Sequence, residues 1–240
     1  MANQTPLHEF ERAGDNALPA AVDVGLRTHM LRVYNYMAGG LALTGAVAYV
    51  GAASGFYTSI AGTPIIWIVL LAPLAMVFFL SFRIQTMGLA TAQLSFWAYA
   101  GLVGLSLSSI FLVYTGESIA RVFFISAATF GATSLFGYTT RTDLSRFGSF
   151  LFMGLIGIII ASLVNMFMAS TALQFAISVV GVLLFTGLTA HDTQRIKEIY
   201  TAGENNVITG KKAIMGALAL YLDFLNLFLM LMRLFGNRRS

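Results

Sequence analysis

The chain has 240 residues, of which 58% are hydrophobic and only 10% are charged, and its mean hydropathy is +0.80. A soluble domain carries about 25% charged residues, so this composition excludes a soluble globular protein. The net charge of +4 comes from basic residues at the ends of apolar runs, which excludes a nucleic-acid-binding stripe, and the lack of cysteine excludes disulfides and thiolate metal sites.

The first 30 residues are polar and of mixed charge, without the apolar core and cleavage site of a secretory signal. We therefore predict a polar N-terminal segment over residues 1–30, followed by a single membrane domain over residues 31–240.

Seven apolar runs follow, each close to the roughly 20 residues that a helix needs to cross a bilayer. They cover residues 33–53, 65–81, 89–114, 122–138, 147–167, 173–190 and 213–232. These runs are too long and too continuous for the alternating strands of a membrane barrel. The prediction is an all-α, polytopic fold with seven transmembrane helices. Small residues within the runs, such as Ala38, Ala42 and Ala46, are interpreted as helix-packing positions.

The positions of Lys and Arg predict the orientation of the chain. Ten of the fourteen lie in the N-terminal segment or in the connections on the same side of the membrane. Because basic residues accumulate in cytoplasmic loops, the N-terminus is predicted to be cytoplasmic. Arg238 and Arg239 leave two alternatives for the last run. Its length favours a full span, whereas the charge rule favours a re-entrant segment.

Asp223 lies inside the last apolar run. An Asp at the centre of a span costs at least about 2.5–3.5 kcal/mol on insertion scales, so it faces a bundle interior or a wet cavity. Helical spacing puts Asn226 and Arg233 on the same face of the helix. This polar stripe predicts that the last helix is central, surrounded by the other six, and that the stripe lines an ion pathway. A purely structural polar cluster is the alternative.

Asp192 stands just beyond the cytoplasmic end of the sixth run, 31 residues before Asp223, and one predicted cytoplasmic loop joins their helices. The two helices are thus expected to be antiparallel neighbours. Alone, Asp192 is also consistent with a solvated helix end. If the carboxylates meet at about 4 Å, they repel by about 4 kcal/mol at an effective dielectric constant near 20. The pair would then share a proton, and rising pH or a divalent cation would open this contact.

Three stretches carry a family resemblance: ALYLDFLNLFL at residues 219–229 with Arg233 beyond it, GLTAHDTQ at 187–194 and YTTRTDLS at 138–145. From Arg27 to Arg239 the chain resembles the Bax-inhibitor (Lifeguard) membrane family, especially its bacterial members. The resemblance implies a seven-helix protein of the inner membrane that acts as a pH-regulated calcium leak. It also implies that Asp192 and Asp223 form the sensor and calcium-binding pair. Arg233 would pair with an acid in the pore.

The sequence departs from this pattern in its second apolar run, where some relatives carry a Glu and residues 65–81 contain no acid. Glu117 is then a candidate partner for Arg233. No resident cofactor is expected, and the expected partners are the lipid bilayer and calcium or other cations.

Two other functions were weighed against a leak. One is a membrane interaction protein that modulates a partner such as a membrane protease. The other is an intramembrane aspartyl protease, whose second Asp follows a Gly-x-Gly sequence. Asp223 instead follows Leu220, Tyr221 and Leu222, so we expect that the protein is not an enzyme.

Overall fold

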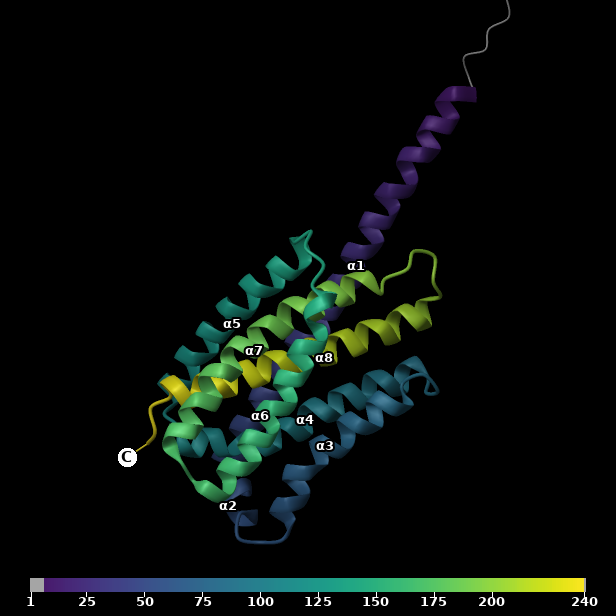
Figure 1. The fold of residues 1–240 in the computed structure, drawn as a ribbon. Helices are drawn as coiled ribbons and strands as arrows, with labels where there is room; N and C mark the ends of the chain where they lie inside the picture. The colour runs from purple at the N-terminus through teal and green to yellow at the C-terminus, as the bar shows by residue number, and fades with distance from the viewer. Residues whose placement is uncertain (1–6, 240) are drawn as a thin grey trace, which may run out of the picture.

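The computed structural model describes residues 7–239, with side chains from residue 24 onward, and almost all of this range is helical (Figure 1). The elements are α1 (Leu7–Ala53), α2 (Phe56–Ile60), α3 (Ile65–Arg83), α4 (Leu89–Val113), α5 (Gly116–Thr139), the 3-10 turn η1 (Ser145–Phe147), α6 (Gly148–Met168), α7 (Thr171–Glu198) and α8 (Asn206–Phe235).

Seven of the described helices are long and apolar enough to cross a membrane, and each predicted run overlaps one of them, although several helices extend beyond the runs by six residues or more at one end. The predicted seven-helix fold is therefore confirmed. The first span includes residues from Val24 onward, so it overlaps the end of the predicted polar segment. Helix α1 extends back to Leu7 and projects beyond the bundle (Figure 1). Residues 1–6 of the predicted polar segment lie outside the described range.

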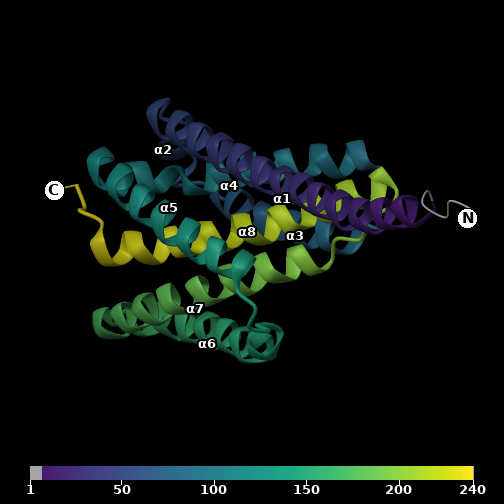
Figure 2. The same ribbon diagram turned by 90° about the horizontal axis from the view of Figure 1, so that it is seen from above.

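The last apolar run forms a full span. Helix α8 has 30 residues, which at 1.5 Å per residue gives a length of about 45 Å, more than the roughly 30 Å of a bilayer core. It is a continuous helix, and the two chain ends lie at opposite ends of the bundle (Figure 2). Of the two alternatives for the last run, the full span expected from its length is confirmed, and the re-entrant segment expected from the charge rule is wrong.

Helix α8 occupies the centre of the bundle, as predicted. In its most apolar window 72% of the residues are buried, against 6–33% in the other six spans. Figure 2 shows it between a layer containing α1 and α4 and a layer containing α6 and α7. Helix α8 contacts α1, α4, α5 and α7. A polar side chain near the middle of this helix, such as that of Asp223, is thus enclosed by protein rather than exposed to lipid.

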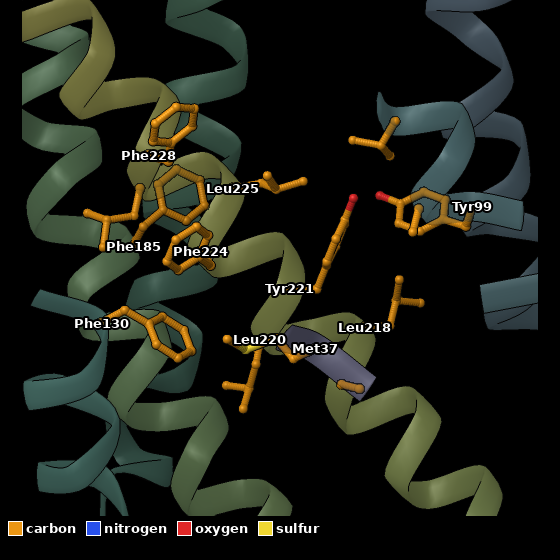
Figure 3. Close-up of a cluster of buried hydrophobic side chains, with 14 of the residues drawn as sticks. Met37, Tyr99, Phe130, Phe185, Leu218, Leu220, Tyr221, Phe224, Leu225 and Phe228 are labelled. Carbon is orange, nitrogen blue, oxygen red and sulfur yellow. The ribbon is translucent and has the colours of Figure 1, made fainter. Parts of the chain in front are cut away.

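Two faces of α8 are fixed by aromatic residues (Figure 3). Tyr221 packs edge-to-face against Tyr99 of α4, with ring centroids 5.7 Å apart. Phe224 packs against Phe130 of α5 at 5.6 Å. Because these contacts fix the rotation of α8 about its axis, the face that carries Asp223 is turned toward α7 and α6.

Two chains of hydroxyl groups connect the helices. The Thr44 hydroxyl donates to the carbonyl oxygen of Ala100 at 2.9 Å and lies 2.6 Å from the Tyr221 hydroxyl, which links α1, α4 and α8. A second chain links α1, α5 and α7. In it the Tyr34 hydroxyl lies 2.6 Å from that of Ser134, which lies 3.0 Å from that of Thr193.

Close backbone contact positions α7 against α5. The Cα of Ala190 lies 2.8 Å from the place where a Cβ on Gly137 would be. Only glycine allows this approach, because an added Cβ would meet backbone atoms that cannot rotate away. The approach lies two residues before Asp192, so it determines where the end of α7 sits.

Candidate functional site

A cavity of about 740 Å³ lies between α6, α7 and α8 and is partly open to its surroundings. Asp192 lines it from α7, and Asp223 and Asn226 line it from α8. The structure thus brings together three of the four residues that the sequence predicted as a site. They come from two helices that pack side by side, as expected for antiparallel neighbours (Figure 1).

Asp223 is the most buried acidic group in the described part of the chain, with a relative exposure of 5%. Its Oδ2 atom has no hydrogen-bond partner among the described residues. A buried carboxyl oxygen without a partner is unfavourable in a membrane interior. Since Asp223 lines the cavity, the space beside it is where a proton, a water molecule or a cation could satisfy that oxygen.

Asp192 is partly exposed, with 21% of its side-chain surface accessible, and its Oδ1 lies 2.8 Å from Nδ1 of His191. The carboxylates of Asp192 and Asp223 line the same cavity. No hydrogen bond joins them in the part of the chain that the structure describes, so the cavity rather than direct contact connects the pair. A bridge through a proton, a water molecule or a cation stays a prediction.

The oxygen atoms that line the cavity are better suited to a cation that binds transiently than to one that stays permanently bound. Calcium takes 6–8 oxygen ligands, and the cavity is lined by three carboxylates, from Asp192, Glu198 and Asp223, and by the amides of Gln194 and Asn226. Residues 24–239 contain no cluster of three or more His, Cys, Asp or Glu side chains that could hold a metal. A cation here would keep most of its water, which suits transit and exchange.

Comparison with known proteins places the chain in a family. The sequence model described as "Inhibitor of apoptosis-promoting Bax1" matches residues 26–240. The chain belongs to the Bax-inhibitor family. It is 51% identical to a Rickettsia prowazekii protein over 219 residues, 91% of this chain and 93% of the relative. It is 47% identical to the inner membrane protein YbhL of Escherichia coli over 239 residues, 97% of this chain and the whole of YbhL. A Streptococcus pyogenes membrane protein is 35% identical over 227 residues, 93% of this chain and 98% of that protein.

Beside Asp192, the stretch that resembled the Bax-inhibitor family fixes the end of α7. Gln194 accepts a hydrogen bond from the backbone N–H of Leu144 at 2.7 Å and donates one to the carbonyl of Thr142 at 2.9 Å. Lys197 donates to the carbonyl of Tyr138 at 2.8 Å. These bonds hold the α5–α6 connection against α7, so Asp192 sits on a rigid support.

Sequence reasoning gave no role to His191 or Gln194. His191 approaches the start of α6 closely, because a Cβ on Gly148 would lie 2.8 Å from its Nε2. The signal for His191 was its position next to an Asp at a helix end. Gln194 was detectable only as a polar residue at a buried helical position, which does not reveal its partner.

Asp143 lies in the α5–α6 connection that packs beside Asp192, but unlike Asp192 and Asp223 it is exposed. Its carboxylate accepts hydrogen bonds from the hydroxyl and the backbone N–H of Ser145, which hold the pKa of this exposed group below its usual value. Asp143 therefore stays ionised throughout the neutral range, and a pH response between about 6 and 8 does not come from it.

Arg233 lies outside the cavity, exposed near the far end of α8. The predicted partner was wrong: Glu117 pairs with Arg121 at 2.7 Å instead. Among the described residues Arg233 makes no salt bridge, which agrees with the alternative that its long side chain reaches the membrane interface. Of the four predicted site residues, it is the one that the structure separates from the others.

Proposed function

We propose that this Bax-inhibitor protein is a passive, pH-regulated leak for calcium or other cations in the bacterial inner membrane. The observation that carries the proposal is the Asp223 carboxylate. It is buried in the central helix, has an oxygen without a described partner, and faces a cavity that it shares with Asp192. A structural polar cluster would instead be expected to satisfy its own hydrogen bonds.

The gate would work through repulsion between the two carboxylates. With one proton shared by the pair, a single negative charge is left on the site, the repulsion is removed, and α7 and α8 stay together. Without it, two charges at about 4 Å would repel by about 4 kcal/mol at an effective dielectric constant near 20. That repulsion either separates the helices or draws in a cation. Rising pH therefore increases flux in this mechanism, and no catalytic step is involved.

Calcium flux into liposomes holding only the purified protein tests the proposal. We expect wild-type flux to rise severalfold from pH 6 to pH 8, because loss of the shared proton restores the repulsion between the two carboxylates. Asp192→Asn and Asp223→Asn remove the repulsion, so each should give a flat pH profile. Glu117→Gln is the matched control, since it neutralises a carboxylate that pairs with Arg121 on the surface. It should behave as wild type.

Unchanged pH profiles in both Asp variants would refute the sensor. A complete lack of flux from wild-type protein that is folded and correctly reconstituted would refute the leak. That second result would favour a protein that modulates a membrane partner such as a protease, because such a protein conducts nothing by itself.

The proposed orientation has its own test, because seven spans put the two chain ends on opposite sides. Alkaline phosphatase, which is active only outside the cytoplasm, should be inactive when fused to the N-terminus and active when fused after Ser240. A cytoplasmic reporter such as green fluorescent protein should give the reverse pattern. An active phosphatase at the N-terminus would overturn the orientation derived from the basic residues.

A further inference from the structure

A second cavity, of about 720 Å³, lies between α1 and α5 on the side of α8 away from Asp223. Its walls come from these two helices and α4, and its floor comes from α8, including Phe224 and Phe228. Both α1 and α5 pack on α8, but they make little contact with each other. The gap between them is therefore a groove that runs along the membrane-spanning part of the bundle. We call it the α1–α5 groove.

The wall on α1 is made of small residues. Ala38, Ala42, Gly45 and Ala46 line the groove and are exposed. The sequence suggested that such residues bring helices together, and nearby Gly40 does so, since its Cβ would lie 3.0 Å from Phe96 of α4. At Gly45, by contrast, no atom lies within 4 Å of the Cβ position. The small residues thus leave space that no other described part of the chain fills.

The groove continues toward the end of the bundle that carries the N-terminus. A further cavity of about 560 Å³ lies there, again between α1 and α5, and shares Phe130 with the first. Its lining differs, because it includes the guanidinium-bearing Arg27 and the hydroxyl-bearing Tyr138, together with Tyr34, whose hydroxyl is already paired with Ser134. One long crevice therefore has an apolar section within the span and a basic, hydroxyl-bearing section at the membrane interface.

We propose that this crevice binds one anionic phospholipid from the leaflet on the N-terminal side, with an acyl chain in the α1–α5 groove and the phosphate beside Arg27. The division into apolar and basic sections matches the two parts of a lipid molecule. Arg and Tyr at an interface are suited to lipid phosphates.

Native mass spectrometry of the full chain tests the proposal, with phosphatidylglycerol and phosphatidylethanolamine titrated separately into detergent-solubilised protein. Gly45→Leu places a side chain in the groove, where its Cβ would have no other atom within 4 Å. We expect it to weaken phosphatidylglycerol binding at least tenfold. Gly131→Leu, which fills open space in the interfacial section, should have a similar effect. Arg27→Gln should reduce the preference for phosphatidylglycerol over phosphatidylethanolamine severalfold.

Gly157→Leu is the matched control, since it also has no atom within 4 Å of its Cβ position but lines neither cavity. It should bind lipid as wild type does. Circular dichroism and gel filtration confirm that each variant is folded. Equal lipid binding by wild type, Gly45→Leu and Gly131→Leu would overturn the proposal. So would a wild-type dimer that Gly45→Leu converts to a monomer without a change in lipid binding, because the occupant would then be a second copy of the chain.

Discussion

The Gly137→Ala protein is expected to unfold at a clearly lower temperature than wild type, although only one methyl group is added. A Cβ at this position would lie 2.8 Å from Cα and 2.9 Å from the carbonyl carbon of Ala190. These are backbone atoms, so the clash can be relieved only by separating α5 from α7. Overpacking of this kind typically costs about 1–3 kcal/mol, and occasionally more. The displacement would also reach Asp192, two residues farther along α7.

Gly131→Ala on the same helix is the control for this prediction. No atom lies within 4 Å of its Cβ position, and alanine is favoured over glycine in a helix by about 1 kcal/mol. Thermal unfolding of the purified proteins in one detergent, followed by gel filtration, should show Gly137→Ala well below wild type and Gly131→Ala at or above it. Equal melting temperatures for the two variants would mean that α5 and α7 pack less closely than described.

Asp223→Leu is expected to give a protein that is more stable than wild type and conducts no cations. An Asp at the centre of a span costs about 2.5–3.5 kcal/mol relative to a favourable environment, and one oxygen of Asp223 has no described partner. Leucine has a similar size and no polar atoms, so much of that cost should be recovered. A gain of stability with a loss of activity is typical of a residue retained for function.

Asp192→Leu provides the comparison. The Asp192 side chain is 21% exposed and bonded to His191, so its removal should change the melting temperature little while it also eliminates the pH response. Both variants can be measured by thermal unfolding and by liposome flux on the same preparations. A lower melting temperature for Asp223→Leu would show that the Asp223 carboxyl supports the fold, for example through a buried water molecule.

The positions of the spans followed from the sequence, because bilayer thickness sets the length of an apolar run and few other constraints compete with it. The central place of α8 followed from Asp223, since an acidic residue in that run has nowhere favourable to lie except inside the bundle. Asn226 was assigned to the same face of α8 as Asp223 because it lies three residues farther along the helix. These predictions depended on properties of one helix at a time.

Properties that depend on two helices were less predictable. Successive residues are about 100° apart around a helix, so a small error in rotation changes which side chains meet. The sequence could not show that the Glu117 carboxylate pairs with Arg121, or that the Gln194 side chain forms hydrogen bonds with the α5–α6 connection. For the same reason Ala42 was predicted to pack against a helix, although it lies exposed in the α1–α5 groove.

The two hydroxyl chains have a fixed polarity. The Thr193 hydroxyl donates to the Thr189 carbonyl at 2.7 Å, so Ser134 must donate to Thr193, and Tyr34 to Ser134. The Thr44 hydroxyl likewise gives its only proton to a carbonyl, which leaves Tyr221 as the donor to Thr44. Each chain ends on a backbone oxygen that has no proton to return, so neither can reverse its direction as a proton wire must. The proton exchange that the proposed gate requires would therefore not run through either hydroxyl chain.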